Sequence, residues 1–151
     1  KSLLDLPTTL ETLEALGVPV LGFGCDRFPA FYTAESDLNV TYRFDDMAML
    51  AAALRGHWAL PHTGGALVCN PPPEEVAMAA DEVEALVLDA TAAAHAAGIS
   101  GGELTPFVLS HMRRASGDQT LRVNAALAIA NAGLAGKLAA SLAISLKDPA
   151  L

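Results

Sequence analysis

Three polar residues are the first candidates for chemistry in this sequence: Lys1, Asn124 and Asn131. A lysine amine becomes a nucleophile when burial or a neighbouring cation lowers its pKa, and nothing in the chain obviously does this for Lys1. Asn124 and Asn131 are seven positions apart, so they share one face of an otherwise apolar helix. A carboxamide there must find hydrogen-bond partners. The residues alone leave two interpretations open for these asparagines: capping of neighbouring backbone, or presentation to a ligand or partner.

The histidines and cysteines do not predict a metal site. The four histidines share no metal-ligand spacing: His57, His62, His95 and His111. We interpret them as surface or hydrogen-bonded residues. Cys25 and Cys69 are far apart in the chain, and we expect both to be small core residues with reduced thiols, as in a cytoplasmic protein. The Gly-Phe-Gly segment at 22–24 lacks the third glycine of a dinucleotide-binding loop and predicts a turn.

Composition narrows the class of partner. The chain has 151 residues, enough for one domain, and its formal net charge of −8 argues against nucleic acid or an anionic membrane surface as a partner. The most apolar stretch, 124–144, contains two asparagines and Lys137. A charge near the middle of a membrane-spanning helix is costly, so we interpret this stretch as a buried helix of a soluble protein with no membrane partner.

The segments that must position these residues alternate between helix and strand. Helical spacing with typical start and stop residues predicts helices at 7–16, 47–60, 74–97, 106–115 and 120–146. Glu74 and Glu75 open the third helix, and Thr105 caps the fourth. Apolar runs predict strands at 18–24, 38–44 and 64–70, which gives an α/β fold. Each strand is apolar enough to be central, so other chains or another part of a longer polypeptide should complete the sheet.

Five segments support a more specific interpretation: KSLLDLPTTLETLEALGVPVLGFG, FPAFYTAES, LVCNPPPEE, ELTPFVL and SGDQTLRVNAALAIANA. In this order and spacing they resemble the pseudouridine-5′-phosphate glycosidases, also called indigoidine-synthase-A-like proteins. The resemblance covers nearly the whole chain. It implies that residues 1–151 are the C-terminal half of a single domain with an α/β/α layered fold and a mixed central sheet. It also implies a homotrimer.

The family resemblance implies an enzyme that reversibly converts pseudouridine 5′-phosphate and water into uracil and ribose 5-phosphate. A lysine amine forms an imine at the anomeric carbon of the ring-opened ribose, which lets the carbon–carbon bond break. Lys1 matches this lysine, so the resemblance reverses our interpretation of it and makes it the catalytic nucleophile. Asn124 matches an asparagine that lines the family's pocket, and Asn131 matches a neighbouring one. Both are therefore expected to bind substrate.

The family's other functional groups have no counterpart in this chain and are expected upstream of Lys1. They are a general acid/base glutamate, a second lysine, the phosphate-binding residues and an aspartate that holds a divalent metal, usually manganese. The chain alone should therefore hold no metal and be inactive without the N-terminal half. Two alternatives stay open: a C-glycosynthase that joins ribose 5-phosphate to an aromatic acceptor, and a non-catalytic binding or structural relic of the fold.

Overall fold

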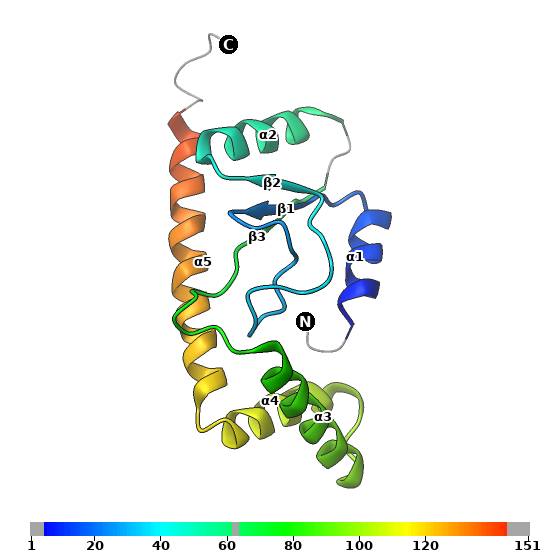
Figure 1. Cartoon of the computed structure of the whole chain (residues 1–151). Coiled ribbons are helices and arrows are strands. Elements are labelled where there is room, and N and C mark those ends of the chain that lie inside the picture. The colour runs from blue at the N-terminus through cyan, green and yellow to red at the C-terminus, as the bar shows by residue number, and fades with distance from the viewer. Residues whose placement is uncertain (1–4, 62–63, 145–151) are drawn as a thin grey trace.

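The computed structural model describes residues 5–61 and 64–144, so Lys1 and His62 lie outside the described residues. The elements follow one another along the chain as shown in Figure 1: α1 (Leu6–Ala15), β1 (Val20–Phe23), β2 (Tyr42–Phe44), α2 (Met47–Ala59), β3 (Leu67–Cys69), α3 (Ala80–Ala96), a short 3-10 helix (Gly101–Glu103), α4 (Leu104–Ala115) and α5 (Gln119–Ile144). This order confirms the predicted α/β class and the approximate position of each predicted element.

The described sheet has the strand order β2-β1-β3, and both pairs are parallel. Leu21 of β1 is in register with Tyr42 on one side and Val68 on the other. Only β1 is central in this sheet. β2 is an outer strand here, with Tyr42 65% exposed and Arg43 exposed too, so the expectation that other chains or another part of a longer polypeptide complete the sheet stays a prediction. Both outer strands therefore keep a free edge within the described chain.

Alternate side chains of β1 pack on opposite faces of the sheet, as a period of two residues requires. Val20 packs in a cluster with Cys25, Phe28 and Cys69, and this cluster is covered by leucines of α1. Leu21 packs with Leu50 and Leu54 of α2, against Leu138 and Leu142 of α5. The sheet thus lies between α1 on one face and α2 with α5 on the other, which confirms the predicted layers (Figure 1).

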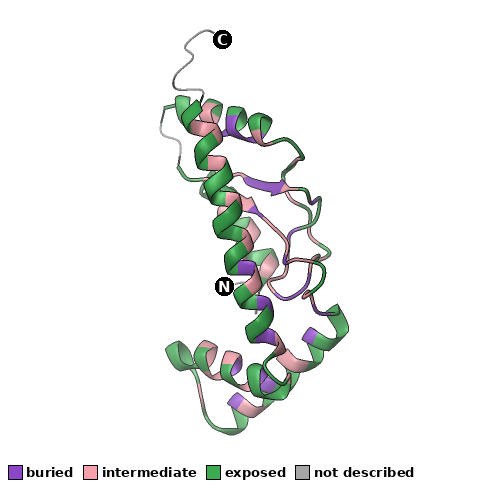
Figure 2. Cartoon of the chain, turned by 90° about the vertical axis from the view of Figure 1, so that its left-hand side faces the viewer, coloured by how far each residue is buried: buried purple, intermediate pink, exposed green. Residues whose placement is uncertain are grey.

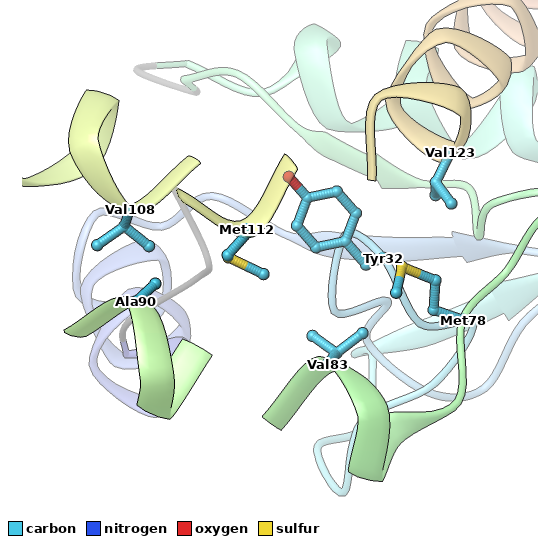
Figure 3. Packing of buried hydrophobic residues seen from close by; sticks show 7 residues of the cluster. All are labelled: Tyr32, Met78, Val83, Ala90, Val108, Met112 and Val123. Atoms are coloured by element: carbon cyan, nitrogen blue, oxygen red, sulfur yellow. The ribbon is translucent and has the colours of Figure 1, made fainter. Parts of the chain in front are cut away.

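A second core joins α3 and α4 to the first part of α5. Figure 3 shows its seven buried residues: Tyr32, Met78, Val83, Ala90, Val108, Met112 and Val123. Tyr32 and Met78 come from loops, and a backbone hydrogen bond of 2.9 Å from the Met78 amide to the Tyr32 carbonyl ties these loops together. Through this core, the helical part of the chain is fixed to the loop that follows β1.

Two predicted helix starts were wrong. α3 begins at Ala80 rather than Glu74, because the amides of Val76 and Ala77 donate to the Pro73 carbonyl and form a separate turn. Asp81 and Glu82 instead supply the negative charge in the first helical turn. The Gly101–Glu103 turn leads directly into α4, so Thr105 lies inside that helix and does not cap it.

The prediction that the apolar stretch is buried was also wrong within the described chain. Only Thr120, Val123 and Leu127 of α5 are buried, and Ile129 is 75% exposed. Figure 2 shows the helix exposed along most of its length. By length and composition alone α5 could cross a membrane, with a mean hydropathy of 1.5. The apolar residues on every side of α5 predicted a helix that is buried all round, but the described residues pack against only one side of it.

Candidate functional site

The carboxyl ends of the three parallel strands meet beside α5, which is the edge where open α/β sheets bind their ligands. A hollow of about 960 Å³ opens there, between the strand ends and the second half of α5. Its polar lining comes from both sides. The strand ends supply Asp45, Asp46 and Asn70, and the helix supplies Lys137 and Ser141.

A second hollow, of about 460 Å³, lies between β3, the loop at 28–31 and α5. Aromatic and aliphatic side chains form most of it, including Phe28, Phe31 and Leu134. The two carboxamides in its lining are Asn70 and Asn131, and Asn70 also lines the first hollow. An apolar hollow with a few convergent polar groups is the usual form of a small-molecule site.

Asn70 and Asn131 are joined across this site. The Asn70 Nδ2 donates to the Asn131 Oδ1 at 3.2 Å, linking the end of β3 to the middle of α5. Asn70 is half-buried and Asn131 is exposed. Within the described part of the chain, neither side chain makes another hydrogen bond. The pair therefore keeps one NH₂ group, on Asn131, and one carbonyl oxygen, on Asn70, available to a ligand.

The candidate residues from the sequence are brought together only in part. Asn131 lies at the site, whereas Asn124 is exposed on α5 about two turns earlier and lines neither hollow. Lys1 is outside the described residues. The roles of all three remain predictions.

Sequence reasoning missed Asn70. The available signal was its position, because it is the first polar residue after an apolar strand and directly precedes three prolines. A residue there lies at the carboxyl end of a parallel strand. Pro71 restricts its backbone to extended conformations. Pro72 is buried and anchors the chain just beyond it.

The loop after β1 that forms one wall of the site is tightly constrained. Gly24 has φ +70° and makes the predicted turn. The Ser36 hydroxyl donates to the Phe28 carbonyl at 2.6 Å. Phe31 has φ +71°, a conformation that costs free energy for a non-glycine residue. Its ring is held edge-on against Tyr32, with ring centroids 4.7 Å apart. The surrounding core therefore holds Phe31 in a strained position at the edge of the apolar hollow.

Besides Lys137, the ionisable groups near the site include two carboxylates and two thiols. Side-chain hydrogen bonds from Arg43 lower the pKa of Asp45, so this carboxyl is ionised at neutral pH. Asp46 caps α2 by accepting from the Met49 amide at 2.9 Å. Burial raises the pKa of Cys25, and it raises the pKa of Cys69 to about 12. Both thiols are free and buried, as expected, and neither is a nucleophile at neutral pH.

Among residues 5–61 and 64–144, no three His, Cys, Asp or Glu side chains come close enough together to hold a metal ion. The described residues therefore do not form a site for a divalent cation.

The family of the chain follows from its sequence match. The sequence pattern of the family described as indigoidine synthase A like protein matches residues 1–141. This chain belongs to the indigoidine synthase A-like family.

Several indigoidine synthase A-like relatives carry a more specific name. The chain is 47% identical over 142 residues to a pseudouridine-5′-phosphate glycosidase of Methylobacterium nodulans, covering 94% of this chain and 42% of the relative. It is 44% identical to the enzyme of the same name from Gemmatimonas aurantiaca, over 94% of this chain and 46% of the relative. The chain thus spans about half the length of the curated relatives it matches.

Two solved structures share the fold. The prealnumycin C-glycosynthase AlnA, in complex with ribulose 5-phosphate, has a TM-score of 0.89 and 34% identity, over 97% of this chain and 49% of AlnA. An indigoidine synthase A-like protein from Thermotoga maritima has a TM-score of 0.80 and 29% identity, over 95% of this chain and 46% of that protein. The family and its layered α/β fold are therefore established for this chain.

Proposed function

We propose that this chain is part of an enzyme that cleaves or forms the carbon–carbon glycosidic bond of pseudouridine 5′-phosphate. The observation that carries the proposal is the 47% identity, over 94% of the chain, to a protein named for this activity. The structure adds a site of suitable chemistry, with two carboxamides beside an apolar hollow at the carboxyl edge of the sheet. The substrate is a small phosphorylated sugar or nucleotide.

Lys1 is the proposed nucleophile. Its neutral amine bonds to C1 of the ribose as the bond between C1 and the ring oxygen breaks, and the ring oxygen takes a proton to become a hydroxyl, which opens the ring. When the carbon–carbon bond breaks, its electron pair passes to C5 of uracil, which takes a proton, and C1 is left as the imine of Lys1. Water then hydrolyses the imine, releases ribose 5-phosphate and returns the free amine. Asn124 and Asn131 are proposed to orient the substrate during these steps.

We propose that the remaining groups belong to the N-terminal half of the same polypeptide. That half would supply the general acid/base, a second lysine, the phosphate-binding residues and a site for a divalent metal, with manganese as the expected ion. Its packing on α5 accounts for the exposed Ile129 and Ile144 better than a membrane does, because Asn131 and Lys137 interrupt the same helix. A homotrimer in the cytoplasm, without a nucleic-acid partner, completes the proposal.

A second candidate function is supported by the AlnA neighbour, whose TM-score of 0.89 is higher than that of the Thermotoga maritima protein. In this alternative the same lysine chemistry runs in the synthetic direction and attaches ribose 5-phosphate to an aromatic acceptor. A non-catalytic relic of the fold is the third candidate, and it requires that the upstream acidic and metal-binding residues be missing.

Borohydride trapping tests the common step of both catalytic candidates. The full-length protein is incubated with ribose 5-phosphate, reduced, digested and mapped by mass spectrometry. We expect a reduced sugar adduct on Lys1 and none on Lys137, which serves as an internal control. Product analysis with uracil or a polycyclic aromatic acceptor then separates glycosidase from glycosynthase. An unmodified Lys1 in a protein that binds the sugar would refute the imine mechanism and favour the relic.

A further inference from the structure

The hydrogen bond between Asn70 and Asn131 joins two parts of the chain that are 61 residues apart. Asn70 is held by the end of β3 and by the proline that follows it, whereas Asn131 projects from an exposed turn of α5. The hydrogen bond therefore runs from a half-buried side chain to an exposed one.

A carboxamide on an exposed helix face has two nearly equivalent orientations, related by a half turn about χ2. In one orientation it presents its NH₂ group to a ligand, and in the other its carbonyl oxygen. The Asn70 Nδ2 can pair only with the carbonyl oxygen of Asn131, because two NH₂ groups cannot hydrogen-bond. This contact turns the Asn131 NH₂ group away from Asn70 and leaves it free to donate to a ligand.

We propose that Asn70 is a positioning residue, which acts through Asn131 by holding its carboxamide as a hydrogen-bond donor to a carbonyl or hydroxyl oxygen of the substrate. The inference rests on the proposed function, in which Asn131 binds substrate. Asn70 is assigned no contact with the reacting atoms.

Two substitutions of Asn70 separate positioning from simple tethering of α5. Asn70→Ala removes the hydrogen bond, so Asn131 divides its time about equally between the two orientations. The fraction competent to bind falls to about half, and KM should rise about twofold. Asn70→Asp keeps the shape of the side chain, but its carboxylate only accepts. The new carboxylate accepts from the Asn131 NH₂ group and so turns the Asn131 carbonyl oxygen toward the ligand. Because the ligand then loses one good hydrogen bond, KM should rise about tenfold.

The matched control is Asn39→Asp, which makes the same change of shape and charge at another carboxamide. Asn39 is exposed and lies near the amino ends of the strands, in a hollow that includes Pro19 and Val20. We expect its kinetics to match the wild type. The kcat of the Asn70 variants should change less than twofold, because the contact with Asn131 acts on binding.

The experiment measures KM and kcat of the full-length protein for pseudouridine 5′-phosphate, with the thermal midpoint of each variant. The order of KM expected from positioning is wild type and Asn39→Asp lowest, then Asn70→Ala, then Asn70→Asp. In an Asn131→Ala background, Asn70→Asp should have no further effect. If Asn70→Asp will not fold, Asn70→Ala and its Asn131→Ala double variant carry the same test.

Three results would overturn the proposals in distinguishable ways. If Asn70→Asp matches Asn39→Asp while Asn70→Ala loses stability, Asn70 only tethers α5 and the inference fails alone. If Asn131→Ala leaves KM unchanged, the proposed substrate contact of Asn131 fails together with the inference, while the proposed reaction itself stands. A wild-type protein that neither releases uracil nor forms a C-glycoside refutes the proposed function, and the inference with it.

Discussion

Gly22 lies on the central strand where a Cβ has no room, and Gly22→Ala should destabilise the protein strongly. A Cβ at this position would lie 2.1 Å from the backbone carbonyl oxygen of Cys25, 3.0 Å from a methyl group of Val40 and 3.1 Å from the Cys25 sulfur. Real Cβ contacts are not found below 3.0 Å, so the closest contact must lengthen by about 1 Å. The obstacle is backbone, which cannot rotate away.

The loss of stability in Gly22→Ala depends on how far the backbone of the turn after β1 must shift. Overpacking of a core costs about 1–3 kcal/mol, and a clash with backbone between β1 and its own turn belongs at the upper end, at about 3 kcal/mol. For a chain of about 150–250 residues, that corresponds to a fall of about 6–12 °C in Tm, and to a smaller fall in the longer full-length protein. The control is Gly56→Ala in α2, where a Cβ meets nothing within 4 Å. This substitution should stabilise the protein by about 0.5–1 kcal/mol through helix propensity.

Thermal and urea unfolding of the two full-length variants, followed by circular dichroism, measures the difference. The reasoning would be refuted if Gly22→Ala unfolded within about 1 kcal/mol of the wild type while Gly56→Ala behaved as expected. That outcome would mean that the turn after β1 shifts freely. The wall formed by Phe28 and Phe31 would then be less rigid than its contacts indicate.

Three further predictions concern the thiols, a helix cap and the exposed helix. Because burial raises the pKa of Cys25 and Cys69, iodoacetamide at pH 8 should label neither residue in the native protein and both in urea, and rapid native labelling would contradict this. Hydrogen bonds from Thr8 lower the pKa of Asp5 below its ordinary 3.8. The free energy of unfolding lost in Asp5→Ala should therefore be constant near neutral pH and vanish as the pH falls below about 4. A loss that does not depend on pH would contradict this prediction. Ile129→Lys should lower the Tm of the full-length protein by several degrees if its exposed face is covered there, whereas a solvent-facing Ile129 would give almost no change.

The local elements were predictable because their end signals lie within a few residues. Asp46 caps α2 directly before the helix predicted at 47–60, and Pro7 stands in the first turn of α1. The start of α3 was predicted too early because the negative charges of Glu74 and Glu75 favour a helix N-terminus. Their neighbours Val76 and Ala77 instead donate to Pro73, and this turn places Met78 in the core. Local charge was a weaker influence than burial of an apolar side chain.

The candidate site was harder to predict because its residues come from distant segments. The apolar pattern around Asn131 gave its position on a helix but not its neighbour, since Asn70 pairs with it only after β3 and α5 pack together. Asn70 carries no distinctive spacing relative to Asn131. Topology is the missing information, because the carboxyl end of a parallel strand is recognised only once the strand pairing is known.

Two exposed surfaces of the described chain border the open site. β3 has a free edge beside the hollow that contains Asn70 and Asn131, and α5, which forms the opposite wall, is exposed over most of its length. A free parallel edge and an apolar helix face are both costly to leave in water, so the same covering segment would satisfy both. A segment that packed there would also close the hollow and reduce its contact with water. Burial of that kind is what a lysine amine needs in order to be neutral and nucleophilic at physiological pH. In the proposed enzyme, completion of the sheet and activation of the nucleophile are therefore expected to depend on the same packing.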